Sequence, residues 1–176
     1  MDYIYWNRMA VATQASVEEY LSTTYCPDCD YLDGEVVERT LGEYNHARTQ
    51  GLTVSTLMLE ERKWGITVLP EQRVQVRPER FRVPDVCVLA PGASKEQIIT
   101  QPPFLCIEIL SSDDHMGRVM ERIEDYFAMG VPHVWVLDPW RRRGYHYTPE
   151  GMHEAKDGLL RTSDPHLTVP LASVFS

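Results

Sequence analysis

The sequence predicts an α/β protein with a mixed central sheet flanked by helices, and two features carry this prediction. First, two segments with helical spacing of apolar residues, 43–63 and 116–127, alternate with short apolar runs. Second, the run 104–110 is nearly all apolar, which is typical of a central strand covered on both faces. Helices packed on both faces of a sheet are the usual way to bury such a strand.

The first forty residues predict a short helix followed by a hairpin. Ser16 and Glu19 have the spacing of a capping box, so a helix is expected to run through Leu21. Asp33-Gly34 lies between two apolar pairs and is a strong signal for a two-residue hairpin turn, because both turn residues need positive φ.

The next hundred residues predict the order helix, three strands, helix, strand. A long helix is expected over 43–63, where the chain has no proline, and Gly65 suits its C-terminal cap. Alternating valines predict a half-buried strand at 74–76, and apolar runs predict strands over 81–89 and 104–110. A second amphipathic helix should end at Gly130, followed by a buried strand over 134–137.

Beyond residue 140 the chain predicts a strand meander at the edge of the sheet, because turn dipeptides that contain glycine recur there. A length of 176 residues is usual for one domain. We therefore expect a single domain over 1–176, with a helix and hairpin at about 1–40, a core at about 41–140 and the meander at 141–176.

The charge and the N-terminus limit the classes of function. A formal net charge of -9 and a pI near 5.1 argue against a general nucleic-acid coater, which must neutralise phosphates with lysine and arginine, although a local basic patch is compatible with them. Residues 1–8 lack the features of a signal peptide, and no apolar run is long enough to cross a membrane. The expected location is the cytoplasm.

The cysteines favour ordinary buried thiols over a metal site. Cys26 and Cys29 have a Cys-x-x-Cys spacing, but no second pair follows, so a zinc site would have to recruit distant histidines. Cys87 and Cys106 lie inside apolar runs, where a free cysteine behaves as a small hydrophobic residue.

Two acidic residues stand out in the predicted strands. Asp85 follows a proline at the start of an apolar run, and Glu108 is the one charge in the run 104–110, where an unpaired carboxylate would cost several kcal/mol. Two acids on neighbouring strands could form a Mg²⁺ or Mn²⁺ site. The alternative is that each carboxylate forms an ion pair with an arginine such as Arg82 or Arg122.

Other polar residues are weaker candidates. Glu35 follows the hairpin turn, Glu43 and His46 share one turn at the start of the long helix, and Glu71 precedes the strand at 74–76. Any of them could face a metal, but solvated surface charges, or a capping histidine, are equally ordinary explanations. The acidic loop 113–115 also suits a helix start. Arginines 141–143 could contact phosphates or form a solvated turn, and Trp140 adds an aromatic surface there.

Four motifs follow one another along the chain: Pro84-Asp85, Ile-Glu-Ile-Leu-Ser at 107–111, the segment 126–132 and Trp-Val-Leu-Asp-Pro at 135–139. Taken in this order, they resemble the Uma-type putative restriction endonuclease family, also called domain of unknown function 820. That family belongs to the PD-(D/E)xK nuclease-like superfamily, and the resemblance covers most of the chain, from about residue 30 to 139. It implies a restriction-endonuclease-like core in which Asp85 and Glu108 bind Mg²⁺ or Mn²⁺.

The chain departs from the superfamily pattern at its lysine. A lysine normally lies two residues after the second acid, where this chain has Leu110, and Uma-type sequences place it instead on the following helix. By its spacing from Tyr126, that position is Arg122 here. Arginine keeps the positive charge but does not release a proton at neutral pH, so it could stabilise a phosphate and could not act as a base.

Two hypotheses of function follow. The first is a divalent-metal-dependent endonuclease that hydrolyses phosphodiester bonds of DNA, with Asp85, Glu108 and Arg122 as catalytic residues. The alternative is a catalytically degenerate nuclease fold that serves as a nucleic-acid- or protein-binding module, which the missing lysine and the negative charge both permit. A homodimer is expected, because two copies of one site can cut both strands. Apolar residues near the C-terminus could cover the second copy as well as their own core: Leu167, Val169, Leu171, Val174 and Phe175.

Overall fold

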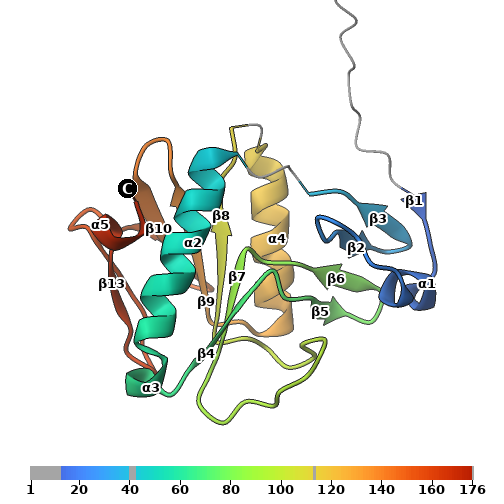
Figure 1. The fold of residues 1–176 in the computed structure, drawn as a ribbon, viewed down its shortest axis with the longest axis horizontal. Coiled ribbons are helices and arrows are strands. Elements are labelled where there is room, and N and C mark those ends of the chain that lie inside the picture. Colours follow the sequence, from blue (N-terminus) through green and yellow to red (C-terminus); the bar gives the residue numbers. More distant parts are fainter. Residues whose placement is uncertain (1–12, 40–42, 113, 176) are drawn as a thin grey trace, which may run out of the picture.

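The computed structural model describes residues 13–39, 43–112 and 114–175, which form an α/β fold (Figure 1). Residues 1–8, for which the sequence predicts no signal peptide, lie outside the described residues. The same holds for Asp113 of the acidic loop. Within the described ranges, no helix is long and apolar enough to cross a membrane.

The central sheet of the described chain has six strands in the order β11-β10-β9-β8-β7-β4. β8 and β9 are parallel and the other neighbours are antiparallel, so the sheet is mixed, as the sequence predicts. The sequence patterns do not predict β4. The bounds are Thr67–Pro70 for β4, Val86–Leu89 for β7, Leu105–Ile109 for β8, His133–Asp138 for β9, Arg143–Thr148 for β10 and Gly151–Glu154 for β11.

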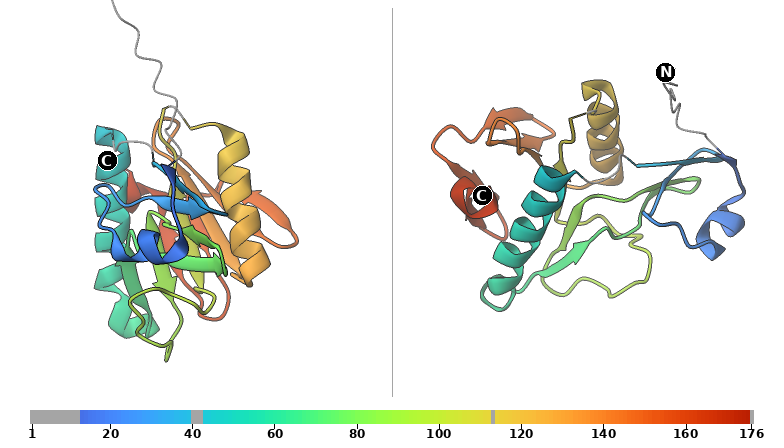
Figure 2. Two further views of the ribbon diagram at one scale, coloured as in Figure 1. Left: turned by 90° about the vertical axis from the view of Figure 1, so that its right-hand side faces the viewer. Right: turned by 45° about the horizontal axis from the view of Figure 1, so that its top comes forward.

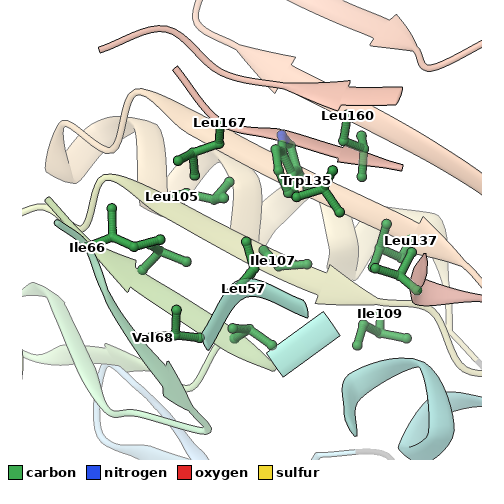
Figure 3. Close-up of a cluster of buried hydrophobic side chains, with 14 of the residues drawn as sticks. Leu57, Ile66, Val68, Leu105, Ile107, Ile109, Trp135, Leu137, Leu160 and Leu167 are labelled. Carbon is green, nitrogen blue, oxygen red and sulfur yellow. The ribbon is translucent and has the colours of Figure 1, made fainter. Parts of the chain in front are cut away.

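Helices α2 (Tyr44–Leu59) and α4 (Met116–Met129) cover opposite faces of this sheet (Figure 2). Successive residues of a strand point to opposite faces. Leu105 of β8 belongs to the core on the α2 side, which Figure 3 shows, and Cys106 belongs to the core on the α4 side. Glu108, two residues after Cys106, therefore points toward α4, and this alternation is what directs a carboxylate at that helix.

A second sheet contains the predicted hairpin. In the described chain it has five strands in the order β1-β3-β2-β6-β5. Asp33 and Gly34 form the turn with φ values of 51° and 102°, and Ser16 and Glu19 make a complete capping box, so both predictions are confirmed. The bounds are Thr13–Gln14 for β1, Val17–Ser22 for α1, Asp30–Leu32 for β2, Glu35–Val37 for β3, Val74–Arg77 for β5 and Arg80–Arg82 for β6.

The single strand predicted over 81–89 is wrong, because the run is divided between the two sheets. Its first part belongs to β6 of the five-stranded sheet, and its last part is β7 of the central sheet. Pro84 lies at the break, and proline cannot donate a hydrogen bond to a strand ladder. The crossing places Asp85 where the chain enters the central sheet, next to the start of β7.

The long helix predicted over 43–63 forms as two helices. α2 ends at Leu59, Glu60 has φ -103° and ψ 0°, and α3 (Glu61–Trp64) adds one further turn. Gly65 caps α3 in the left-handed conformation with φ 69°, as the sequence predicts.

The C-terminal segment packs against the core on the α2 side of the central sheet. β10 and β11 form the sheet edge as predicted, but β12 (Leu159–Arg161) and β13 (Thr168–Pro170) form a separate two-stranded sheet in the described part, followed by α5 (Leu171–Val174). Four of the five residues that the sequence offers for a second copy are buried in the core that contains Trp135: Leu167, Val169, Val174 and Phe175. Figure 3 shows Leu167 in this core. These four residues thus cover the chain's own core, and the dimer stays a prediction.

His133 of β9 and His146 of β10 lie side by side as neutral rings. Nδ1 of His133 is 3.0 Å from Nε2 of His146, and Nε2 of His133 is 3.2 Å from the carbonyl oxygen of Ser163. Burial lowers the pKa of His146 to about 4, to which the charge of His133 also contributes. Burial lowers the pKa of His133 as well.

This histidine pair makes the stability of the fold sensitive to acid. Unfolded histidines titrate near pH 6.5, so below that pH the unfolded chain binds more protons than the folded one. The stability is therefore complete above about pH 6.5 and is lost as the pH falls toward about 4. We expect His146→Phe to lose less thermal stability than the wild type between about pH 7.5 and about pH 5. Equal losses, measured by circular dichroism, would contradict this assignment.

Candidate functional site

Asp85 and Glu108 lie next to each other because β7 and β8 are neighbouring antiparallel strands. Val86 is paired with Ile107, so the residue before Val86 lies beside the one after Ile107. The backbone N–H of Ile109 donates to Oδ2 of Asp85 at 2.7 Å, which fixes that carboxylate against β8. Both acids are buried, with an exposure of 2% each. The two carboxylates that the sequence singles out thus share one buried location.

Asp85 is neutralised by Arg39 and His46. Arg39 forms a hydrogen-bonded ion pair with Oδ1, and Nε2 of His46 is 3.3 Å from Oδ2. Burial alone would raise the pKa of Asp85, but the hydrogen bond with His46 and the charge of Arg39 hold it below its ordinary value. Burial disfavours the charged ring of His46, yet the hydrogen bond and charge of Asp85 raise its pKa.

Glu108 is held by two side chains of α4. Nη1 of Arg122 lies 3.2 Å from Oε2, and the hydroxyl of Tyr126 donates to Oε1 at 2.5 Å. Burial raises the pKa of Glu108 to about 7 against the opposing charge of Arg122, and the neighbouring Asp85 also raises it. The ion-pair alternative thus describes part of the geometry, with Arg39 in place of Arg82 as the partner of Asp85.

A third buried carboxylate, Asp30 of β2, lies on the other side of Arg122. Its Oδ2 is 3.6 Å from Nε of Arg122 and accepts a hydrogen bond from Arg82 at 2.9 Å. Its Oδ1 accepts from the N–H of Val83 at 3.0 Å. Asp30 therefore helps to orient the guanidinium that contacts Glu108. No sequence signal marked Asp30 or Arg39, because their proximity to the site depends on how the two sheets meet.

Asp125 of α4 fixes that helix against the five-stranded sheet. Its carboxylate accepts hydrogen bonds of 2.7 Å from each of three arginines, Arg77, Arg80 and Arg82. Asp125 is 2% exposed, and these contacts hold its pKa below its ordinary value although burial would raise it. Because Asp125 lies less than one helical turn after Arg122, this cluster sets the position from which Arg122 reaches Glu108.

The remaining candidates lie at different distances from the carboxylates. Glu35 is exposed on β3, where it accepts a hydrogen bond from Gln14, so the structure does not bring it to the site. The N–H of Glu71 donates to the carbonyl of Asp85 at 3.3 Å, but its side chain is exposed and bonds to Gln50. Glu43, at the cap of α2, accepts from Ser112 through Oε1, and its Oε2 is buried without a hydrogen-bond partner in the described structure.

The space around the carboxylates is narrow. The cavity that Arg39, His46 and Asp85 line with Arg122 has a volume of about 10 Å³, about the least that holds one water molecule. The described residues contain no group of three or more histidine, cysteine or acidic side chains placed to hold a metal. Cys26 and Cys29 are free cysteines and belong to no such group. A metal held here would depend on the two carboxylates, with water or substrate completing its ligands.

Comparisons with known proteins agree with this fold. A family model described as "Uma2: Putative restriction endonuclease" matches residues 17–173. The structure is similar to the crystal structure of a putative nuclease of the DUF820 family from Anabaena variabilis, with a TM-score of 0.75 and 21% sequence identity over 92% of this chain and 97% of that one. No curated protein sequence matches the chain. The structural similarity shows a nuclease-like fold.

Proposed function

Because the chain belongs to the Uma2 family of putative restriction endonucleases, we propose that it is a divalent-metal-dependent endonuclease that hydrolyses phosphodiester bonds of DNA. The observation that carries the proposal is the buried pair Asp85 and Glu108 on neighbouring strands. Two carboxylates so close together are costly without cations around them. Arg39 and Arg122 supply part of that charge.

The donor set suits Mg²⁺ or Mn²⁺. Mg²⁺ takes oxygen ligands and usually needs only one or two carboxylates, with water and substrate phosphate in its other positions. Asp85 and Glu108 would hold the ion, and a bound cation would offset both the burial and the charge of Asp85 that raise the pKa of Glu108. When bound, a divalent ion polarises the scissile phosphate and lowers the pKa of an attacking water.

The residues around the carboxylates have separate roles in this proposal. His46 and the N–H of Ile109 hold Asp85 in one orientation through its Oδ2. Tyr126 does the same for Glu108 through its Oε1. Arg122 supplies a fixed positive charge that stabilises the phosphate as charge develops on its oxygens, and as an arginine it does not accept the proton of the water.

The role of Arg122 can be tested by substitution. We expect Arg122→Ala to reduce cleavage by a factor on the order of a hundred, the scale for removal of one contact that stabilises the transition state. Arg122→Lys restores the residue of the family and should keep or raise the activity. Arg161→Ala, which removes an exposed arginine that pairs with Asp157, is the matched control and should leave the cleavage rate unchanged. Equal rates in wild type and Arg122→Ala, at saturating Mn²⁺, would remove Arg122 from the mechanism.

The alternative function, a binding module without catalysis, is favoured by two observations. The cavity at the carboxylates is narrow, and each carboxylate already forms an ion pair with an arginine. A degenerate nuclease fold, retained as a nucleic-acid- or protein-binding module, would have this closed arrangement. Incubation of supercoiled plasmid with the protein and Mn²⁺ separates the two. The endonuclease should convert the plasmid to nicked circles, and EDTA should prevent this. Without nicking, and without Mg²⁺ or Mn²⁺ binding in calorimetry, the binding module is the better account.

We also propose that the endonuclease acts as a homodimer. Two copies of one site, related by two-fold symmetry, are the simplest way to cut both strands of a duplex. The dimer is proposed on symmetry, since four of the five C-terminal apolar residues are buried within the chain. Light scattering at micromolar concentration should give twice the chain mass of 20.3 kDa. A monomer mass would contradict the dimer and leave the chemistry of the site unaffected.

A further inference from the structure

We propose that the cavity at the C-terminal ends of β8 and β9 binds an unpaired nucleobase of the DNA substrate, with Trp140 as its stacking surface. The proposal rests on the proposed endonuclease function and adds that the bound base belongs to a single strand or has left the stack of a duplex. The cavity has a volume of about 580 Å³ and lies between the loops after the two parallel strands and the start of α4. Its lining includes Met116, Trp140 and Arg141.

The cavity lies next to the carboxylate site. Ser111 and Asp114 line both the large cavity and the narrow cavity beside Asp85. The N–H of Ser111 donates to Oδ2 of Asp114 at 2.7 Å, and the N–H of Asp114 lies 3.2 Å from the carbonyl oxygen of Ser111. Ser111 and Asp114 thus form a wall that the two cavities share. In our proposal, a nucleotide with its phosphate at the carboxylates places a neighbouring base in the large cavity.

The turn that carries Trp140 is fixed by a buried side chain. Asp138, at the end of β9, is 3% exposed, and its Oδ1 accepts from the backbone N–H groups of Trp140 at 3.0 Å and Arg141 at 2.9 Å. Its Oδ2 accepts from Nη1 of Arg141 at 3.0 Å. Trp140 is 55% exposed, and Met116, which also lines the cavity, is 56% exposed.

These side chains match a nucleobase. A large exposed aromatic ring offers a flat surface for base stacking, a thioether packs against ring edges, and an arginine adds a positive charge near the phosphate chain. The side chain of Arg141 is 71% exposed, so its charge faces solvent even while it pairs with Asp138. The net charge of -9 makes a broad electrostatic surface for DNA implausible, so local contacts of this kind have to supply affinity.

Stacking on an aromatic ring distinguishes an unpaired base from a base in a duplex. In a duplex both faces of each base are covered by its neighbours, and a base has to leave the stack before it can lie on an aromatic side chain. Single strands expose those faces at no such cost, and stacking on a ring is tolerant of sequence. We therefore expect Trp140 to favour single-stranded DNA over blunt duplex of the same length.

The test measures binding of a fluorescein-labelled single-stranded oligothymidylate and a matched duplex by anisotropy, with Ca²⁺ in place of Mg²⁺. Trp140→Ala should weaken binding of the single strand by about tenfold, the scale of losing one stacked ring, and should change duplex binding less. Trp140→Phe keeps an aromatic face and should retain most of the affinity. Leu59→Ala removes an exposed apolar residue of 82% exposure on α2 and should bind as wild type does.

Each outcome decides the proposal. Wild-type affinity in Trp140→Ala would overturn the base-binding cavity and leave the endonuclease proposal intact, because plasmid nicking is measured separately. Equal losses in Trp140→Ala and Leu59→Ala would also overturn it. If the wild type binds neither oligonucleotide, the cavity proposal is lost, and the nicking assay then decides whether the endonuclease proposal is lost with it.

Discussion

Asp85→Ala and Glu108→Ala should each abolish plasmid nicking, with a loss on the order of a thousandfold in rate. Each change removes one of the two carboxylates that we propose hold the divalent ion, whose contribution to the transition state is several kcal/mol, and each 1.36 kcal/mol is about tenfold in rate. Initial rates of plasmid nicking at saturating Mn²⁺ measure the loss.

Glu35→Ala is the matched control for these variants. Glu35 is also an acid on a strand, but it is exposed and bonded to Gln14 away from the carboxylates, so its removal should leave the rate unchanged. Nicking by Asp85→Ala at the wild-type rate would remove that carboxylate from the mechanism. If both alanine variants fail to fold, the two acids are structural ion-pair partners.

The structure separates the stability effects of the two acids, which the sequence alone treats as equal. Removal of Asp85 leaves Arg39 and the N–H of Ile109 without their buried acceptor. Removal of Glu108 leaves the hydroxyl of Tyr126 without its acceptor, but the charged Arg122 still lies near Asp30. Because an unpaired buried group costs more than a lost pair, Asp85→Ala should be less stable than Glu108→Ala in thermal unfolding.

Asp125→Ala should destabilise the fold by about 3–5 kcal/mol, the scale for removal of one partner from a buried ion pair. The change leaves three arginines around an empty position, and Arg80 and Arg82 have side chains only 9% and 4% exposed. Urea unfolding followed by circular dichroism measures the loss. Asp125→Asn keeps one acceptor oxygen and should lose less.

The control for Asp125 is Asp157→Ala, which breaks an exposed ion pair with Arg161. Here the two side chains are 56% and 45% exposed, and such surface pairs contribute about 0–1 kcal/mol. Asp125→Ala variants no less stable than Asp157→Ala would show that the cluster does not fix α4. A loss of stability that is accompanied by intact nicking at low temperature would show that Arg122 is positioned by other contacts.

Local signals in the sequence were enough to predict most helices and strands. The capping box at Ser16, the Asp33-Gly34 turn and the helix end at Gly130 each depend on a few neighbouring residues, and each forms as expected. The run 81–89 was not predicted correctly, since the pattern of apolar residues does not show that Pro84 divides it between two sheets. Which strands become neighbours is decided by tertiary packing.

In the candidate site too, local sequence features could be predicted, and contacts set by tertiary packing could not. Glu108 was conspicuous because one charge interrupts a buried strand, which is a local feature of the sequence. Arg39, which follows β3, contacts Asp85, and Tyr126 of α4 contacts Glu108, while Asp30 of β2 contacts Arg122. No spacing in the sequence relates these three residues to Glu108. These residues come together only because the two sheets and α4 pack against one another in the folded chain.

A crystal of the protein soaked in Mn²⁺ tests the central claim most directly, because the anomalous signal of manganese locates the ion without assumptions about activity. The account predicts one peak in contact with the carboxylates of both Asp85 and Glu108, with Arg39 or Arg122 displaced from its present partner. An absence of any peak there at saturating Mn²⁺, with both arginine–carboxylate pairs intact, would contradict it.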